Sequence, residues 1–331
     1  MFLLLSWQSS KKNGQNNKKV LLFPLYILFF SLLTLLFPNC KSKANWHTST
    51  LLYFDTVCEI KLFCNSLQFE SAQEKLKKTF KEVEKYFSPE SKDYSSPVIL
   101  ELYKKAHKVY ISTGGCFDIT VAPLSFIWGF HNHSRHIPDP DQIRAILKNI
   151  GMNKIGQKEK KLIVPEGMSL DWGAIAKGYG IDRASRELIK IGIKRGFINA
   201  GGDLYCWGNN PNNQYWKIGI KHPRGKGILG VLSISNTGTA TTGDYQRFFI
   251  KNKKRYHHVF DPKTGYPARG KQSVTVIGPE TLLCDALSTA LFVSKTPEKI
   301  LKKYPDYGAV IVDSKGKIRW SGKKYSFSLL K

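Results

Sequence analysis

The spacing of apolar positions predicts a chain that mixes helices and strands. Apolar residues recur every three to four positions in the expected helices, whereas the expected strands are short apolar stretches bounded by Gly- and Pro-rich turns. The predicted helices are 69–87, 98–112, 140–150, 182–191 and 281–293. The predicted strands are 51–62, 197–207 with an interruption at Gly201-Gly202, 216–221, 230–235, 247–250, 273–277, and a terminal hairpin of 309–312 with 317–320.

The order of these elements indicates an α+β fold. The strands follow one another in a mostly antiparallel style with inserted helices, and they do not form a regular βαβ repeat. A chain of 331 residues with 42% apolar content has ample material for a core. Because no long linker appears between Trp46 and Lys331, we expect one large domain over residues 51–331, preceded by a short tether at 41–50.

The first forty residues have the composition of a targeting segment. Residues 11–19 contain four lysines, and residues 20–37 form an uncharged apolar run of eighteen residues. Such a run is typical of an export signal, and it could also barely span a bilayer as an uncleaved anchor. Cys40 directly after the run indicates a bacterial lipoprotein site, so residues 1–40 are interpreted as a lipoprotein signal; a cleaved, soluble protein is the third alternative.

All three alternatives place the rest of the chain outside the cytoplasm. The lysines around the apolar run agree with this orientation. We therefore expect the protein at the periplasmic side of the inner membrane, attached through its lipid-anchored N-terminus. Its six cysteines form no CxxC pair, so neither a zinc ribbon nor a thioredoxin-type centre is indicated, and buried free thiols are expected.

The net charge of +26 comes from lysines that are spread along the chain. Such lysines are most often a solvated surface; an anionic ligand, an anionic membrane or a nucleic acid are the functional alternatives. The sequence contains no recognition-helix, zinc-finger or RNP-type signature. A nucleic-acid partner is therefore not expected.

Residues 170–182 combine an acid, three glycines and a lysine where a turn leads into a predicted helix. Asp171 lies where the helix is expected to begin, and the glycines allow a backbone or a ligand to come close. Lys177 adds a full charge to the positive end of the helix. This combination suits a phosphate–metal site, although a Gly-rich helix start without a ligand explains it equally well.

Asp285 and Thr289 stand four positions apart on the predicted helix 281–293. Their side chains therefore share one face of the helix, one turn apart. A carboxylate with a hydroxyl is a hard-oxygen pair that suits Mg²⁺ better than zinc. The alternative is an Asp near a helix start and a Thr bonded to the backbone.

Two turns and one loop complete the candidate chemistry. His258 precedes the tight turn 261–265 and could act as a base or an acid near neutral pH, with a structural histidine as the alternative. The hydroxyl-rich turn 241–245 could hold phosphate oxygens, though turn formation alone explains it. One further loop contains three histidines, His131, His133 and His136. Their spacing fits no regular metal signature, so a solvated loop is expected.

Taken together, these clusters resemble the ApbE-type FAD:protein FMN transferases. The resemblance runs from about residue 51 to residue 312, through six ordered motifs. The motifs are 115–124 with 128–130, 170–182, 199–203, 241–245, 258–267 and 273–293. It implies an ApbE-like, T-fold-like domain that binds FAD in a cleft with Mg²⁺ at the pyrophosphate. It also implies transfer of FMN to a Thr or Ser hydroxyl of a target protein as a phosphoester, with release of AMP.

The resemblance also assigns roles to individual residues. It implies that Asp285, Thr289 and the backbone carbonyl of Ala174 hold Mg²⁺. It implies that FAD is contacted by Phe54, Cys116, Phe117, Asp118, Asp171, Lys177 and Val259. His258 is the candidate base for the incoming hydroxyl, because phosphoryl transfer needs charge neutralisation, alignment and a modest base.

The sequence departs from the family pattern at three places. Phe54-Asp55-Thr56 stands where many relatives have Met-Gly-Thr, Thr242 stands where Ser is usual, and residues 88–97 are shorter than the matching segment. FAD hydrolysis to FMN and AMP, or FAD binding without catalysis by a surface lipoprotein, are therefore alternatives. For the transferase, the expected partners are FAD and membrane electron-transport subunits such as those of a sodium-pumping quinone reductase.

Overall fold

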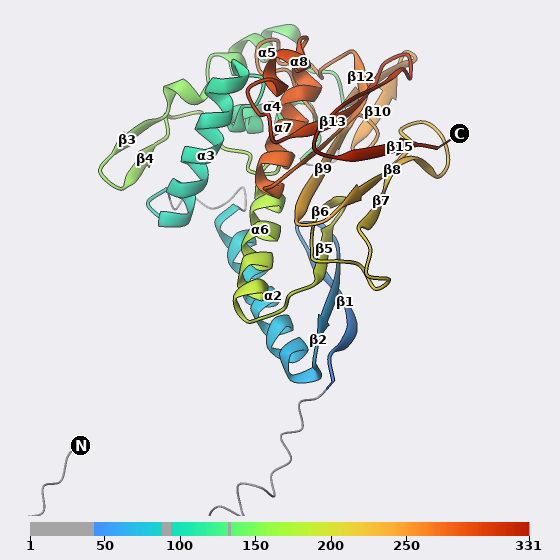
Figure 1. Cartoon of the computed structure of the whole chain (residues 1–331). Coiled ribbons are helices and arrows are strands. Elements are labelled where there is room, and N and C mark those ends of the chain that lie inside the picture. The colour runs from blue at the N-terminus through green and yellow to red at the C-terminus, as the bar shows by residue number, and fades with distance from the viewer. Residues whose placement is uncertain (1–42, 88–93, 132–133, 331) are drawn as a thin grey trace, which may run out of the picture. The chain divides into compact units, whose positions relative to one another are not determined.

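An antiparallel sheet of eight strands organises the chain (Figure 1). The computed structural model describes residues 43–87, 94–131 and 134–330, and Ala44–Lys331 cluster as one unit. In spatial order the sheet contains β1 (Asn45–Tyr53), β2 (Thr56–Cys64), β5 (Gly196–Ala200), β6 (Asp203–Trp207), β9 (Thr237–Gly243), β12 (Lys271–Gly278), β13 (Gly308–Asp313) and β14 (Ile318–Ser321). All neighbouring strands are antiparallel. The expected α+β class is confirmed.

Three small sheets accompany the main one. A three-stranded sheet has the order β15 (Ser326–Leu329), β8 (Ile228–Ile234) and β7 (Trp216–Lys221). The two hairpins are β10 (Phe248–Lys251) with β11 (Lys254–His257), and β3 (Gly156–Lys158) with β4 (Lys161–Ile163). The α-helices are α2 (Ser66–Phe87), α3 (Pro97–Thr113), α4 (Ala122–Ile127), α5 (Pro140–Leu147), α6 (Ala176–Lys190), α7 (Thr281–Val293) and α8 (Pro297–Leu301), and two 3₁₀ turns, η1 and η2, cover Ile119–Val121 and Met152–Lys154.

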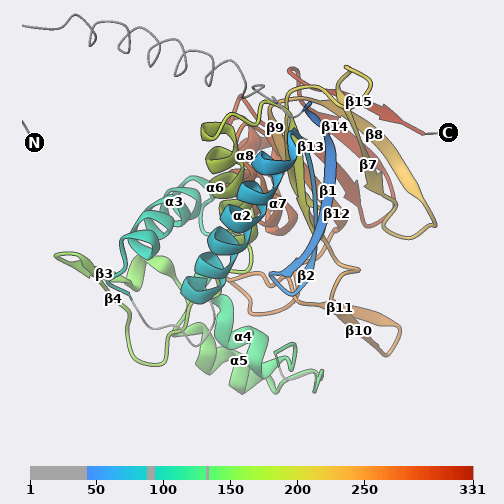
Figure 2. The ribbon, with the colours of Figure 1, turned by 90° about the horizontal axis from the view of Figure 1, so that it is seen from below.

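The main sheet is covered on both faces. Helices α2, α6 and α7 lie on one face, and the sheet of β7, β8 and β15 lies on the other, as Figures 1 and 2 show from two directions. All eight residues of β12 are buried for this reason. Val274 and Val276 belong to the core beneath α7, whereas Ile277 belongs to the core beneath β7 and β8. Alternate residues of one strand thus serve two separate cores.

Helix α7 lies at the centre of the larger core. Eleven of its thirteen residues are buried, which agrees with its nearly continuous apolar sequence. The side chain of Asp182 on α6 accepts hydrogen bonds from the backbone N–H groups of Thr281 and Leu282, both at 2.9 Å. A carboxylate from a neighbouring helix therefore caps the buried N-terminus of α7, whose free N–H groups would otherwise lack partners.

Two glycines allow the first turn of α7 to approach its neighbours. A Cβ atom on Gly178 of α6 would lie 2.6 Å from the carbonyl oxygen of Thr281. A Cβ on Gly238 of β9 would lie 2.5 Å from the Thr281 hydroxyl. The start of α7 is thus held between α6 and β9 at a spacing that only glycine permits.

The predicted helix 281–293 matches α7, and most other predicted elements match within a few residues. The expectation that a helix begins at Asp171 is wrong: residues 173–175 form turns and α6 begins at Ala176. Residues 51–62 are a hairpin rather than one strand, with Phe54 and Asp55 in its turn. Strand β9 was not predicted, because its Thr- and Gly-rich sequence resembles a turn.

Two further expectations concern the thiols and the membrane. Of the cysteines in the described part of the chain, Cys58, Cys64, Cys206 and Cys284 are buried, Cys116 is half-buried, and all five are free. Within that same part, no helix has the length and apolar character needed to cross a bilayer. The predicted signal at 1–40, Cys40 and residues 41 and 42 of the expected tether lie outside the described residues. Residues 45–50, which were expected to belong to the tether, form the first part of strand β1 in the main sheet.

The close approach at Gly178 leads to a stability prediction. Gly→Ala within a helix normally stabilises it by about 0.5–1 kcal/mol. We expect Gly178→Ala to lower the free energy of unfolding by about 1–3 kcal/mol, because the new methyl group meets the rigid backbone of α7. Urea unfolding of the purified domain measures this difference.

A matched control is Gly180→Ala, two residues further along α6. Its Cβ would meet only the tip of the Phe54 ring, at 2.8 Å, and that side chain can turn away. This variant should lose less stability than Gly178→Ala. Wild-type stability in Gly178→Ala would show that α6 and α7 are not packed as described.

Candidate active site

Lys177 lies between two buried carboxylates. Its ammonium nitrogen is 3.1 Å from Oδ2 of Asp203 and 3.6 Å from Oδ2 of Asp285. The three residues come from α6, β6 and α7, three elements that are far apart in the sequence. The same Lys177 nitrogen donates a hydrogen bond to the carbonyl oxygen of Gly173, at 3.1 Å. The predicted site residues Lys177 and Asp285 are therefore brought together.

Charge is not balanced within this group. Burial raises the pKa of Asp285, Lys177 lowers it, and the like charge of Asp203 raises it again, so the pKa lies well above that of an ordinary carboxyl. Burial alone would lower the pKa of Lys177, but Asp203 and Asp285 outweigh it and raise that pKa. One ammonium thus faces two carboxyl groups, so ionisation of both leaves an excess negative charge that a bound cation would neutralise.

The donor atoms near Asp285 fit a hard cation. Oδ2 of Asp285 accepts from the backbone N–H of Gly178, at 3.3 Å, and its Oδ1 accepts no hydrogen bond from the described residues. Thr289, one turn later, shares a hydrogen bond with the Thr242 hydroxyl at 3.1 Å. Carboxylate, hydroxyl and carbonyl oxygens are the ligands that Mg²⁺ prefers.

Such a metal would depend on few side chains. Within the described ranges, no cluster of three or more His, Cys, Asp and Glu side chains is placed to hold a metal ion. A cation at Asp285 would therefore need hydroxyl or carbonyl oxygens in addition. The predicted carbonyl of Ala174 lies in the turn that precedes α6, next to Gly173, whose carbonyl oxygen already contacts Lys177.

The segment that contains Cys116, Phe117 and Asp118 lies beside this turn. The backbone N–H of Asp171 donates to the carbonyl oxygen of Ile119 at 2.6 Å, which joins the two predicted FAD-binding segments. Asp171 is exposed, and its side chain accepts from the N–H of Gly173 at 2.7 Å. Phe117 is buried in the main core, and Cys116 is half-buried beside it.

The carboxylate of Asp118 is engaged within its own segment. Its Oδ1 accepts from the N–H and the hydroxyl of Thr120, at 2.8 and 2.6 Å, and that hydroxyl accepts from the N–H of Gly151. Burial raises the pKa of Asp118, and the Thr120 hydrogen bonds oppose this. The arrangement holds the shape of the segment, so a contribution of Asp118 to FAD binding remains a prediction.

Phe54 occupies a strained turn near α6. Phe54 and Asp55 form the two-residue turn of the β1–β2 hairpin with φ values of 58° and 53°. Both angles lie in the left-handed region that favours glycine, which costs conformational energy for these two residues. The Phe54 ring packs 5.2 Å from the Phe80 ring and next to Gly180 of α6. The turn therefore holds an aromatic face beside the helix that carries Lys177.

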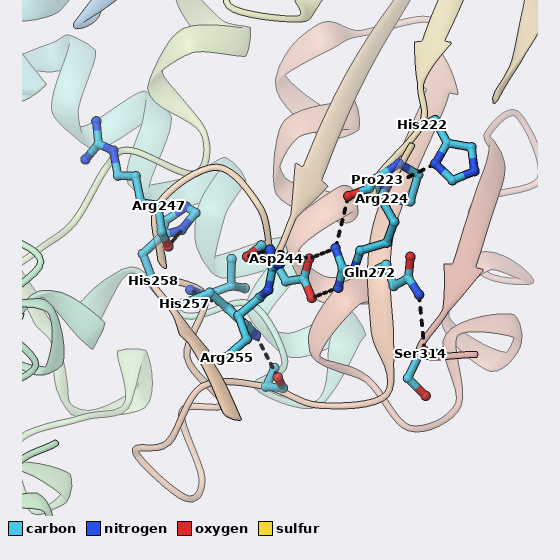
Figure 3. A network of polar contacts seen from close by, with 12 residues as sticks. His222, Pro223, Arg224, Asp244, Arg247, Arg255, His257, His258, Gln272 and Ser314 are labelled. Carbon is cyan, nitrogen blue, oxygen red and sulfur yellow. Dashed lines mark hydrogen bonds and ion pairs between the residues drawn. The ribbon is translucent and has the colours of Figure 1, made fainter. Parts of the chain in front are cut away.

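Two adjacent histidines have different surroundings (Figure 3). His257 is buried, with Nε2 2.9 Å from the carbonyl oxygen of Ala268 and Nδ1 accepting from the N–H of Val259, so both ring nitrogens are used. Among the described residues, His258 has a partner only for Nδ1, which lies 3.3 Å from the carbonyl oxygen of Arg247. Because a carbonyl only accepts, the Nδ1 of His258 carries the hydrogen and Nε2 keeps a free lone pair.

His258 is neutral near physiological pH. Burial lowers its pKa, and the neighbouring His257 and the cation of Arg247 lower it further, to about 3. A neutral imidazole with an unprotonated Nε2 can accept a proton. Val259, a predicted FAD contact, is buried in the main core and gives its carbonyl to the N–H of Ala268.

An ion pair fixes the loop next to these histidines. Arg224, in the β7–β8 turn, forms a bidentate pair with Asp244 at the end of β9, with N···O distances of 2.7 and 2.5 Å (Figure 3). Arg255 of β11 approaches the same carboxylate at 3.8 Å. Bidentate pairs of this kind fix both position and orientation. They connect the small sheet, β9 and the hairpin that leads into His258.

Sequence reasoning missed two acids of this site. Asp203 ends the Asn-Ala-Gly-Gly-Asp motif and Asp182 ends segment 170–182, so both were visible as motif residues but received no role. Of the histidine-rich loop, His133 lies outside the described residues, and His131 packs its ring 4.2 Å from that of Phe126. Residues 88–93, which belong to the segment that departs from the family pattern, also lie outside the described residues.

Known proteins with related sequences point to one family. The model of the ApbE family matches residues 54–311. An FAD:protein FMN transferase of Haemophilus influenzae is 35% identical over 193 residues, which are 55% of this chain and 56% of that protein. One of Klebsiella pneumoniae is 35% identical over 202 residues, 59% of this chain and 61% of that protein. The matched stretches therefore span less than two thirds of the length of these relatives.

Solved structures agree with this result. The crystal structure of an ApbE protein from Thermotoga maritima has a TM-score of 0.78 and 30% identity, and the match covers 84% of this chain and 97% of that chain. The flavin transferase ApbE of Vibrio cholerae shares the fold, with a TM-score of 0.74, 23% identity, and coverage of 85% and 98%. Since the family match includes every residue of the Lys177–Asp203–Asp285 cluster, this chain belongs to the ApbE family.

Proposed function

We propose that this chain is a Mg²⁺-dependent FAD:protein FMN transferase. It moves FMN from FAD to a Thr or Ser hydroxyl of an acceptor protein, forms a phosphoester and releases AMP. The observation that carries the proposal is the placement of Lys177 between Asp203 and Asp285, with the hydroxyl of Thr289 one turn away. The names of the curated relatives support the same activity.

The metal site would consist of Asp285, Thr289 and the carbonyl of Ala174. The excess negative charge beside Lys177 supports a divalent cation there, and the oxygen donors favour Mg²⁺. A bound Mg²⁺ would neutralise charge on the pyrophosphate of FAD. Lys177 supplies a second positive charge close by, and its two carboxylate partners hold it in place.

His258 is the residue that accepts the proton of the incoming hydroxyl. Its Nε2 carries the free lone pair, and the Arg247 carbonyl keeps the ring in this tautomer. The acceptor oxygen forms a new bond to the FMN phosphorus, the P–O bond to AMP breaks, and the hydroxyl proton passes to Nε2. Anionic phosphates nearby would raise the low pKa of this ring and make it a better base.

We also propose an extracytoplasmic, lipid-anchored location for the enzyme. The basic residues 11–19, the apolar run 20–37 and Cys40 support it. Acceptors in membrane electron-transport complexes that face the same compartment fit this location.

Asp285 provides the direct test of the metal. In the presence of a Thr-bearing acceptor protein and millimolar Mg²⁺, we expect Asp285→Ala to lower AMP release from FAD by at least about a hundredfold, equivalent to about 2.7 kcal/mol of lost transition-state stabilisation. Chelation of Mg²⁺ from the wild-type chain should have a comparable effect. Chromatographic measurement of AMP checks both results.

The matched control for this test is Asp306→Ala. Asp306 is an exposed carboxylate that pairs with Lys324, away from the site, and its loss should leave AMP release unchanged. Normal turnover in Asp285→Ala would contradict the metal assignment.

His258 provides the test of the base. We expect His258→Ala to slow FMN transfer at least about a hundredfold while the affinity for FAD, measured by flavin fluorescence, changes less than about threefold, since a general base contributes to the rate and not to binding. In-gel fluorescence of a Thr-bearing acceptor protein measures the transfer.

The control variant is His136→Ala, an exposed histidine outside the site. A parallel loss of FAD affinity in His258→Ala would instead assign His258 to substrate binding. AMP release by the wild-type chain without any covalent flavin on an acceptor would identify water as the acceptor and the enzyme as an FAD pyrophosphatase.

A further inference from the structure

A slot of about 450 Å³ lies on the face of the main sheet opposite α7. Thr241 and Thr275 line it and share a hydrogen bond at 2.8 Å, whereas Thr242, the next residue of β9, bonds to Ser288 of α7 on the other face. The slot is lined by Phe197, Asn199, Gly201, Gly202, Leu204, residues 217–221, Leu232, Thr239, Thr241, Tyr245, Gln246 and Thr275. It is therefore separate from the Lys177 cluster, although both use the same strands.

The slot follows the edge of β7. Five consecutive residues of this strand, 217–221, line it. Because side chains alternate between the two faces of a strand, five consecutive lining residues mean that the backbone of β7 lines the slot as well, whereas β8 contributes only Leu232. In the part of the chain that the structure describes, β7 is the last strand of the β15–β8–β7 sheet, so every second N–H and C=O group along its free side lacks a strand partner. An extended peptide can pair with such an edge.

The lining carries positive charge and no negative charge. Lys217 and Lys221 are the only charged residues that line the slot. Lys217 donates to the Ser233 hydroxyl at 2.6 Å, and Lys221 lies 5.6 Å from the centre of the Tyr245 ring. Neither lysine forms an ion pair with a carboxylate of the described residues. The carboxylate of Glu59, which is not among the lining residues, accepts from the side chain of the lining residue Asn199 at 3.0 Å.

Edge lysines also occur where a strand only needs protection from self-association. Two observations indicate a binding role for this edge. The first is the volume beside the strand, which lies against the polar hydroxyls of β9 and β12 and the apolar side chains of Phe197, Leu204 and Leu232. The second is length: five strand residues at about 3.3 Å each give roughly 17 Å for pairing.

Two segments that line the slot continue directly into residues of the candidate active site. Tyr245 and Gln246 line it and directly precede Arg247, whose carbonyl oxygen orients His258. Gly201 and Gly202 line it and directly precede Asp203, the partner of Lys177. The Arg224–Asp244 pair joins the β7–β8 turn to the residue that precedes Tyr245 (Figure 3). A chain that lies along β7 would therefore contact segments that continue into active-site residues.

We propose that this slot docks an acidic, extended segment of the acceptor protein, which pairs with β7 as an added strand. The proposal rests on the proposed function, since that function requires a protein acceptor whose hydroxyl reaches the site. Lys217 and Lys221 select acidic residues, and the backbone of β7 supplies affinity that does not depend on sequence. Specificity thus comes from charge, and alignment comes from strand pairing.

Three synthetic twelve-residue peptides test the slot on the wild-type chain. The first alternates Glu with Val around one central Thr. The second is the same peptide with every second backbone amide N-methylated, which removes its donors, and the third has Lys in place of Glu. We expect the first to bind at least tenfold more tightly than the others by titration. It should also protect the amides of residues 216–221 from hydrogen exchange.

Charge reversal in the protein provides the second arm. Lys217→Glu with Lys221→Glu should bind the Lys peptide at least tenfold more tightly than the Glu peptide, and this reversed preference shows that the variant is folded. Lys299→Glu with Lys302→Glu, the same charge change at two exposed lysines in and next to α8, should keep the wild-type preference. Equal affinity for all three peptides, or protection confined to segments other than 216–221, would overturn the proposal.

These experiments distinguish an error in the docking proposal from an error in the proposed function. Peptide binding is measured without FAD, and AMP release from FAD is measured with a Thr-bearing acceptor protein and without the peptides. Loss of peptide selectivity with normal AMP release overturns the docking slot alone. Selective binding in a chain that releases no AMP overturns the transferase and supports strand docking, with the acceptor then a binding partner only.

Discussion

The structure depends on the need to compensate two buried carboxylates with one ammonium. Asp203 and Asp285 are both buried, and Lys177 lies within 3.6 Å of each. An unpaired charge at such a position would cost several kcal/mol, so the meeting of β6, α6 and α7 at this point keeps both carboxylates paired. The cap that Asp182 provides for α7 and the close approach at Gly178 hold the same helices in the same relation. Stability and chemistry therefore share one set of contacts.

The two faces of the main sheet contribute to two different regions of the molecule. Neighbouring residues of a strand point to opposite sides, so Thr242 reaches Thr289 on α7 while Thr241 lines the slot beside β7. Likewise, Asp203 pairs with Lys177, and the next residue, Leu204, lines the slot. The face proposed for phosphate chemistry and the face proposed for a polypeptide partner thus use neighbouring residues of the same strands. The same strands thus line both regions, with a separate core on each face of the sheet.

His257 and His258 are adjacent in sequence, but one has a structural role and the other is the candidate base. His257 faces the core and uses both ring nitrogens for backbone hydrogen bonds, which fixes the turn that follows. His258 faces the other way and keeps one nitrogen free. Burial and neighbouring positive charge lower the pKa of both rings, so both are neutral. Only the geometry of their hydrogen bonds distinguishes a structural histidine from a candidate base.

The sequence by itself determined the α+β class, helix 281–293, the shared face of Asp285 and Thr289, and the family to which the motifs belong. These features depend on local periodicity and on residue spacing, which a single chain displays directly. Only the tertiary structure decided that α6 begins at Ala176, that Asp203 holds Lys177, that Asp182 caps α7 and that β7 leaves an edge beside a slot. Each of these joins residues that are distant along the chain, and the cost of burying a charge or a bare helix end can be read only once its neighbours are known.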